Sequence, residues 1–161
     1  MIKNTQFDFQ ELSSMDELNN DDRRLLEKAK EAANNAYAPY SEFRVGAALL
    51  LENGEIITGN NQENAAYPSG LCAERVAMFY ASSQYPGVPF KALAITANSD
   101  KVVINHPISP CGSCRQVMVE YEILSKKPMK VILSGQTGPI YIIDRVTDLL
   151  PFSFGPEELK D

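Results

Sequence analysis

Residues 45–59, VGAALLLENGEIITG, decide the fold, because two apolar runs flank the dipeptide Asn53-Gly54. Asn-Gly between apolar runs is the strongest short-range signal for a β-hairpin. We therefore expect strands at about 44–51 and 55–59. The other elements have to be arranged around this hairpin.

Apolar residues at helical spacing predict three helices around the hairpin. The first covers 21–37 and is followed by Pro39, the second begins near Cys72, and the third begins near Cys111. The remaining elements are expected as strands at about 91–97, 129–133 and 139–143, a helical turn at 147–150 and a loop-like tail. The order α-β-β-α-β-α-β-β indicates an α/β protein in which helices cover a mixed sheet.

The chain has 161 residues, which suits one domain. A polar, acidic arm occupies 1–20, where scattered apolar residues could form a short helix or a loose docking arm. We expect a single catalytic domain over 21–161. The arm lacks the apolar core of a secretory signal, and the chain lacks a run of about 18 apolar residues, so we expect a cytoplasmic protein without a membrane span.

The net charge is −6, from 21 acidic and 15 basic residues. A protein that binds polymeric nucleic acid usually carries a basic stripe, because neutralising phosphates drives its affinity. The sequence contains no run rich in Lys and Arg. This balance disfavours DNA or RNA polymers and is compatible with a small neutral substrate.

The three cysteines, Cys72, Cys111 and Cys114, are the most informative residues. An odd number is a poor disulfide framework, so metal binding or redox chemistry explains them better. Cys111 and Cys114 are three residues apart, which places them on one face of a helix. Cys72 supplies a third sulfur from a second helix start, where the helix dipole favours thiolates.

Three protein ligands leave a tetrahedral Zn²⁺ ion one position for water, which becomes a nucleophile near neutral pH. Glu74, two residues after Cys72, could then shuttle protons between that water, a ring nitrogen and a leaving amine. Three thiolates give the zinc centre a net negative charge. Arg75 could offset this charge by donating hydrogen bonds to the thiolates.

These motifs resemble the cytidine deaminase superfamily in its all-cysteine zinc version. The blocks AYAPYSEFRVGAAL (36–49), GNNQENAAYPSGLCAER (59–75), ISPCGSCRQVM (108–118) and LLPFSFGPEEL (149–159) resemble cytidine deaminases of the small homotetrameric kind. The resemblance implies a three-layer α/β/α sandwich with a five-stranded mixed sheet. It also implies one Zn²⁺ per subunit and hydrolytic deamination of cytidine and 2′-deoxycytidine in pyrimidine salvage. Arg44 departs from the pattern, because proline is common there.

The resemblance also implies roles for individual residues. The zinc ligands would be Cys72, Cys111 and Cys114, and the proton shuttle would be Glu74. Contacts to the nucleoside would come from Phe43 (base pocket), Asn61 and Glu63 (ribose), the backbone of Ala73 and Ser109 (base and amino group), Ala65 and Tyr67 (a neighbouring subunit's site) and Phe154 (stacking on the base across a subunit boundary). The active sites of a homotetramer would thus be shared between subunits.

Several other interpretations stay open at the level of sequence. His106 could close a structural Cys₃His zinc site, or Cys111 and Cys114 could form a redox pair. Glu74 could be an ordinary first-turn helix glutamate that suits the helix dipole, and Arg75 could be a surface charge. Asn61 and Glu63 could be turn and surface residues, and the aromatic residues could pack in the core. A deaminase of another aminated nucleoside, such as blasticidin S, and a non-enzymatic zinc module are the alternative functions.

Overall fold

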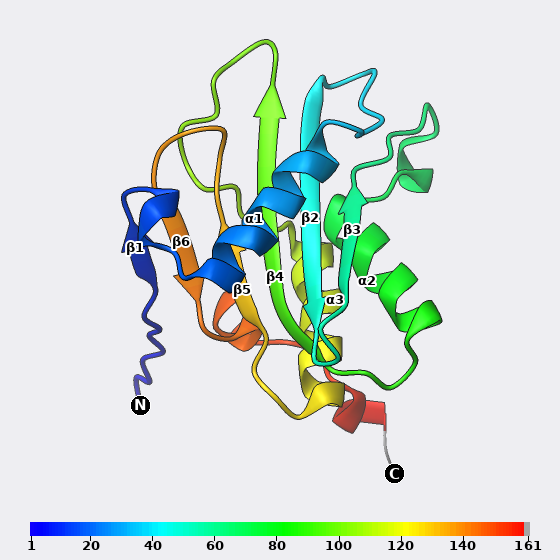
Figure 1. Ribbon diagram of the computed structural model, residues 1–161. Coiled ribbons are helices and arrows are strands. Elements are labelled where there is room, and N and C mark those ends of the chain that lie inside the picture. The colour runs from blue at the N-terminus through cyan, green and yellow to red at the C-terminus, as the bar shows by residue number, and fades with distance from the viewer. Residues whose placement is uncertain (160–161) are drawn as a thin grey trace.

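The computed structural model describes residues 1–159, which form a six-stranded sheet between two helical layers (Figure 1). The strand order is β1-β6-β5-β4-β2-β3. The strands are β1 (Gln10–Leu12), β2 (Phe43–Leu51), β3 (Ile56–Asn60), β4 (Phe90–Ser99), β5 (Lys130–Leu133) and β6 (Ile140–Ile143). β4 and β5 run parallel and the other neighbours antiparallel, so the sheet is mixed as predicted.

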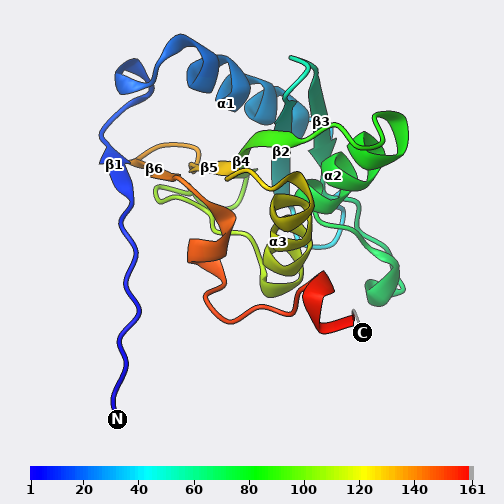
Figure 2. The ribbon, with the colours of Figure 1, turned by 90° about the horizontal axis from the view of Figure 1, so that it is seen from below.

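The helices lie on both faces of the sheet. α1 (Asn20–Ala33) covers one face, and α2 (Ala73–Gln84) and α3 (Gly112–Ser125) cover the other, as Figure 2 shows. The alternation of side chains along each strand feeds two cores. In β2, Leu49 packs in the core beneath α2 and α3, whereas Ala48 packs beneath α1. The predicted three-layer α/β/α sandwich is confirmed.

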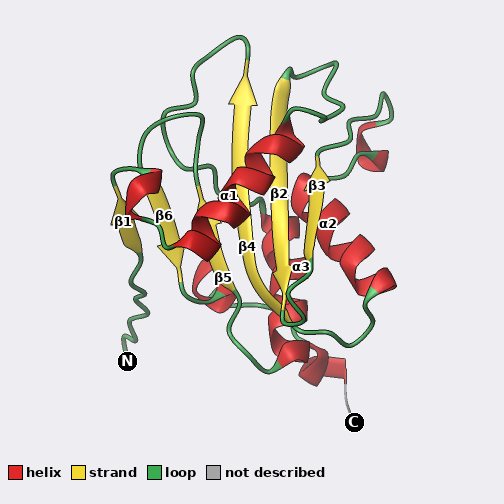
Figure 3. Cartoon of the chain, viewed as in Figure 1, coloured by secondary structure: helices red, strands yellow, loops and turns green. Residues whose placement is uncertain are grey.

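Short 3₁₀ helices complete the chain between these elements (Figure 3). They are η1 (Met15–Glu17), η2 (Tyr67–Ser69), η3 (Val146–Leu149) and η4 (Pro156–Leu159). η3 overlaps the helical turn expected at 147–150, and η4 lies in the tail expected to be a loop. Within residues 1–159, no helix is both long and apolar enough to cross a bilayer. Residues 160 and 161 of the expected catalytic domain lie outside the described residues.

The hairpin predicted around Asn53-Gly54 is confirmed. β2 and β3 pair antiparallel from Gly46↔Asn60 to Leu50↔Ile56. Gly54 has a φ of 89°, a left-handed conformation that glycine adopts without the steric cost other residues bear. The amide of Gly54 donates to the carbonyl of Leu51 at 3.0 Å, which closes the turn.

The prediction of five strands is wrong, because the arm contributes a sixth. β1 pairs antiparallel with β6, from Gln10↔Ile142 to Leu12↔Ile140. The ring of Phe9 lies 4.7 Å from that of Tyr141, and Leu12 packs against the core beneath α1. A strand of three residues is too short to show a periodicity of two in the sequence, and its pairing with the distant β6 defines it instead.

The first helix is shorter than its predicted span of 21–37. α1 ends at Ala33, and the chain then pairs with the segment before α2. The amide of Tyr37 donates to the carbonyl of Asn61 at 3.0 Å, and the amide of Glu63 donates to the carbonyl of Tyr37 at 2.8 Å. This pairing gives the backbone of Tyr37 partners outside the helix, whereas the amides of 34–36 still donate to carbonyls of the last turn of α1. It also places the loop before β2 beside residues 61–63.

Two glycines set how closely the helices approach the sheet. A Cβ added to Gly59 in β3 would overlap the carbonyl oxygen of Ala73 and lie 2.7 Å from the amide nitrogen of Ala77. A Cβ added to Gly46 in β2 would overlap the carbonyl oxygen of Ala29 in α1. Gly59 therefore fixes the position of the first turn of α2, which carries candidate site residues.

Candidate active site

The three cysteines come together although Cys72 is 39 residues from Cys111. Their sulfur atoms all lie within 4.8 Å of one another, and the Sγ atoms of Cys72 and Cys111 are 3.9 Å apart. Tetrahedral Zn²⁺ with Zn–S distances of about 2.3 Å needs sulfurs about 3.8 Å apart. The donor set and its spacing therefore fit zinc.

Two helix starts produce this arrangement. Cys72 is the N-cap of α2, Cys111 is the N-cap of α3, and Cys114 lies in the first turn of α3. The free backbone N–H groups and the dipole at a helix N-terminus stabilise negative charge. Both predicted helix starts are confirmed, and both place partial positive charge beside the sulfur atoms.

The three thiols differ in acidity because they share one site. Hydrogen bonds from the Cys114 thiol and from Arg75 lower the pKa of Cys72 to about 5. The pKa of Cys114 is raised, first by its hydrogen bond to Cys72 and then by burial. A metal ion that binds the group therefore finds one thiolate already formed at neutral pH.

Glu74 is buried beside the cysteines, with 4% of its surface exposed. Burial raises the pKa of its carboxyl group, and a hydrogen bond with Cys114 opposes this shift. A raised pKa suits a group that accepts and returns protons near neutral pH. Arg75 donates from Nη2 to Cys72 Sγ at 3.6 Å, the contact that charge compensation requires.

A cavity of about 680 Å³ opens beside the cysteines. Nine of the residues proposed from the sequence line it: Phe43, Asn61, Glu63, Tyr67, Cys72, Glu74, Arg75, Ser109 and Cys111. Cavities that hold small ligands usually measure 300–1,000 Å³. Cys72, Cys111 and Glu74 thus face a space large enough for a small organic molecule.

Asn61 and Glu63 form part of the cavity wall. The Asn61 side chain accepts from the amide of Val45 at 2.7 Å and donates to the carbonyl of Phe43 at 2.9 Å. Glu63 accepts from the amides of Tyr40 and Ser41 and from the Ser41 hydroxyl. The hydrogen bond from Ser41 lowers the pKa of Glu63, which keeps it anionic. Both residues hold the segment that carries Phe43.

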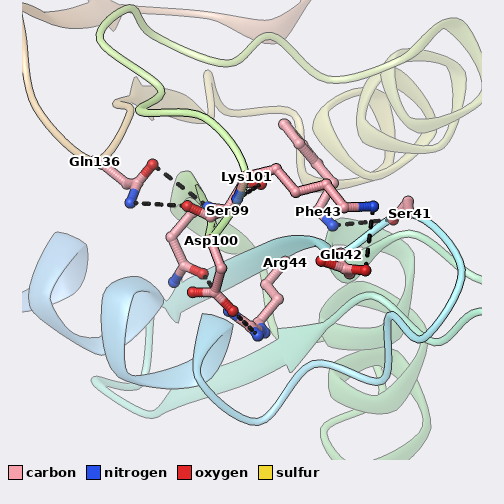
Figure 4. Close-up of polar contacts among 9 residues, drawn as sticks. Ser41, Glu42, Phe43, Arg44, Ser99, Asp100, Lys101 and Gln136 are labelled. Atoms are coloured by element: carbon pink, nitrogen blue, oxygen red, sulfur yellow. Dashed lines mark hydrogen bonds and ion pairs between the residues drawn. The ribbon is translucent and has the colours of Figure 1, made fainter.

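Arg44, the departure from the sequence pattern, lies in the same segment (Figure 4). It forms an ion pair with Asp100, and Lys101 pairs with Glu42 at 3.1 Å between Nζ and Oε1. Arg44 lowers the pKa of Asp100. Arg44 does not line the cavity, so it ties the segment of Phe43 to the end of β4 from outside.

Four proposed residues lie elsewhere. Cys114 is buried and does not line the cavity, and Ala73 is buried in the first turn of α2. Ala65 is exposed in the loop before η2. Phe154 is 58% exposed on the C-terminal segment and does not line the cavity of its own chain. His106 is exposed and is not among the residues whose ligand atoms gather at the sulfurs, which argues against a Cys₃His site.

The sequence reasoning missed other residues that line the cavity. Tyr40, Ser41, Val45, Gln62, Asn64, Gly70, Leu71 and Ile108 belong to this group. All of them lie within the blocks on which the resemblance rests. Their proximity to Phe43, Cys72 and Ser109 in the sequence was the available signal, but residue type alone gave no reason to choose them.

The fold and the site define a class of protein. Three thiols at two helix starts, a buried carboxylic acid and an adjoining cavity fit the centre of a zinc-dependent hydrolase, in which three protein ligands leave one position for water or substrate.

Comparison with known proteins identifies the family. The sequence model described as "Cytidine and deoxycytidylate deaminase zinc-binding region" matches residues 19–127. The chain is 45% identical to a cytidine deaminase of Sporosarcina psychrophila over 141 residues, 87% of this chain and 96% of that protein. It is 38% identical to one of Mycobacterium tuberculosis, over 84% of this chain and 90% of that protein.

Solved structures agree with the sequence comparisons. The cytidine deaminase of Burkholderia pseudomallei superposes with a TM-score of 0.70 at 43% identity, covering 81% of this chain and 97% of that chain. The Mycobacterium tuberculosis cytidine deaminase superposes with a TM-score of 0.65 at 34% identity, covering 85% of this chain and 99% of that chain. The chain belongs to the cytidine deaminase family, and its cofactor is zinc.

Proposed function

We propose that this protein is an enzyme that hydrolyses cytidine and 2′-deoxycytidine, with water, to uridine and 2′-deoxyuridine plus ammonia. One observation carries the proposal: a buried carboxyl group, Glu74, faces the cavity directly beside three clustered thiols. The family membership and the match to cytidine deaminases over most of the chain support it.

Cys72, Cys111 and Cys114 would hold the zinc ion, which when bound supplies the acidity that activates water near neutral pH. Glu74 takes a proton from the attacking water and places it on N3 of the cytosine ring. It then carries the proton of the new C4 hydroxyl group to the amino group on C4, which leaves as ammonia while the C4 carbonyl of uridine forms. Because Glu74 is buried, solvent competes poorly for these protons. Arg75 donates to Cys72 and limits the negative charge of the three sulfurs.

The rest of the cavity would hold the nucleoside. Asn61 and Glu63 would bind the ribose hydroxyl groups. The Glu63 carboxylate already accepts three hydrogen bonds from Tyr40 and Ser41, and a carboxylate has about four acceptor sites, so one remains for a hydroxyl. Phe43 would pack against the base. The backbone groups of Ala73 and Ser109 would contact the base and its amino group.

We also propose that four copies assemble and share their active sites. Ala65, Tyr67 and Phe154 are exposed, with Tyr67 at 78% and Phe154 at 58%, as expected for side chains that complete a neighbour's site. Residues 21–161 would form the catalytic domain, and the arm of 1–20 would be an addition to it. The enzyme would act in cytoplasmic pyrimidine salvage, with free nucleosides and not nucleic acid polymers as substrates.

A direct test follows the loss of cytidine absorbance with purified, zinc-loaded protein. Wild-type protein should convert cytidine to uridine, and Glu74→Gln should lose at least about a thousandfold in kcat, because the carboxylate acts in several proton transfers. The panel should include 2′-deoxycytidine and blasticidin S. Absence of cytidine turnover with one zinc bound per chain would refute the proposal, and turnover of blasticidin S alone would reassign the substrate.

A further inference from the structure

Side chains of α3 hold the C-terminal segment, defined here as residues 146–154. Glu122 is buried, and its carboxylate accepts from the amide of Val146 at 2.8 Å and the amide of Thr147 at 3.1 Å. The same carboxylate accepts from the amide of Met129 at 2.8 Å. Glu122 therefore anchors the start of the segment to the last half of α3.

Arg115 connects two loops that are far apart in the sequence. Its Nε donates to the carbonyl of Pro110 at 2.9 Å, and its Nη1 donates to the carbonyl of Leu149 at 3.1 Å. Pro110 is buried and directly precedes the ligand Cys111, whereas Leu149 is the last residue of η3. One guanidinium group thus joins the metal-binding loop to the C-terminal segment.

Gln116, the next residue of α3, reaches the end of the same segment. Its Nε2 donates to the carbonyl of Phe154 at 2.7 Å. The contact fixes the backbone of Phe154 while its ring stays largely exposed and outside the cavity of its own chain. Arg115 and Gln116 follow directly after Cys114, so the helix turn that carries a zinc ligand also fixes Phe154.

We propose that Arg115 is a positioning residue that sets the C-terminal segment relative to the metal-binding loop and thereby delivers Phe154 to the nucleoside. The delivery step rests on the proposed function, in which Phe154 stacks on a base in a neighbouring site. The planar fork of arginine directs two N–H groups to two carbonyls at once, whereas lysine presents a single point charge. Hydrogen bonds from a charged donor are also the stronger kind.

Hydrogen exchange tests the positioning step directly. The variants are Arg115→Gln and Arg115→Lys, and the matched control is Arg24→Gln, which removes the same charge from an exposed position on α1, in the opposite layer. Amides of 147–154 should exchange about tenfold or more faster in both Arg115 variants, because losing a hydrogen bond to a charged group costs about 1.5–3 kcal/mol. Zinc content should stay at one per chain, and the control should exchange like wild type.

Kinetics test the delivery step. Arg115→Gln should raise KM for cytidine roughly tenfold, the scale of one lost base–aromatic stack, with kcat within about twofold. In a double-mutant cycle with Phe154→Ala, Arg115→Gln should raise KM no further, because both changes remove the same contact. Gln116→Ala, a milder change, removes the hydrogen bond to the carbonyl of Phe154 and should also raise KM. This variant replaces Arg115→Gln in the kinetic test if Arg115→Gln does not fold.

The outcomes separate the proposals. Unchanged exchange at 147–154 in the Arg115 variants would overturn the positioning role, whether or not the protein deaminates cytidine. Faster exchange with KM effects that multiply in the cycle would show that Arg115 does not act through Phe154. Absence of cytidine turnover in the wild-type protein would refute the proposed function. The exchange measurement would still decide whether Arg115 holds the C-terminal segment.

Discussion

At the scale of single residues, the charged groups closest to the three cysteine sulfurs control the chemistry of the site. Arg75 donates to Cys72, the N-cap of α2, and the sulfur of Cys114 lies within 4.8 Å of the other two sulfurs. Each contact changes the protonation of its neighbour. The acidity of these groups therefore reports the geometry of the site.

Replacing Arg75 tests charge compensation. Arg75→Gln removes a positive charge next to the sulfurs, so the site becomes more negative and the ionisation that activates water becomes harder. The rising limb of the pH–rate profile should move upward by about one to two pH units, because at an effective dielectric constant near 20 a unit charge about 6–12 Å away is worth about 1.4–2.8 kcal/mol. A profile that coincides with wild type would contradict this role.

The low pKa of Cys72 predicts how the metal-free protein reacts. With a pKa of about 5, the Cys72 thiol is ionised at pH 6, and its thiolate fraction falls as the pH drops through 5. Alkylation by iodoacetamide at pH 6, followed by mass spectrometry, should label Cys72 well before Cys114, whose pKa is raised. Bound zinc should protect both residues. Equal labelling of Cys72 and Cys114 in the metal-free protein would contradict the assignment.

At the scale of elements, the position of α2 depends on a glycine in the sheet. Gly59→Ala should destabilise the protein by about 1–3 kcal/mol, because the new Cβ overlaps the Ala73 carbonyl and forces the first turn of α2 outward. The same movement displaces Cys72 and Glu74, so kcat should fall as well. Thermal unfolding and cytidine turnover measure the two effects.

Gly46→Ala is the matched control, because it creates a similar overlap with α1 on the opposite face. It should lower stability comparably and leave kcat per folded molecule nearly unchanged. An equal loss of kcat in both variants would show that α2 is not placed through Gly59.

Elements with a strong local sequence signal were predicted correctly, whereas elements defined by tertiary contacts were not. The Asn53-Gly54 hairpin and the helix starts at Cys72 and Cys111 came out at the right places, because turn chemistry and metal-ligand spacing are local properties. β1 was missed because a three-residue strand is defined by pairing with β6 across more than a hundred residues. The end of α1 was misplaced because Tyr37 pairs with 61–63, a tertiary contact.

The candidate site divides in the same way. The thiol cluster and Glu74 could be proposed from spacing and chemistry. Other features depend on how separate loops meet. These are the lining of the cavity by Ser41 and Leu71 and the contacts of Arg115 with Pro110 and Leu149. No residue type signals such contacts in advance.

At the scale of the whole molecule, a zinc ion held by the three cysteines would join the N-terminal ends of α2 and α3. Removing it with a chelator should lower the unfolding temperature by roughly 10 °C, since a ligand at a thousand times its Kd contributes about 4 kcal/mol. Readdition of zinc should restore both stability and turnover. A chelated protein that unfolds at the same temperature would contradict a metal that links the two helices.

Assembly is tested by mass. If Ala65, Tyr67 and Phe154 complete neighbouring sites, light scattering should give four times the chain mass of 17.8 kDa. Mixed tetramers made from the Glu74→Gln and Phe154→Ala variants should also show that sites are shared. In such a tetramer, a site with an intact Glu74 can receive Phe154 from a neighbouring subunit, so turnover should return at some sites. A monomer with full activity would contradict shared sites.

X-ray absorption spectroscopy at the zinc edge tests the central claim most directly. Three thiolates that hold the ion beside Glu74 predict three sulfur neighbours at about 2.3 Å and one oxygen neighbour at about 2.0 Å, without the multiple scattering of an imidazole ring. A fourth sulfur, or the signature of a coordinated histidine, would mean that protein side chains fill the shell, and the account of a hydrolytic centre would be contradicted.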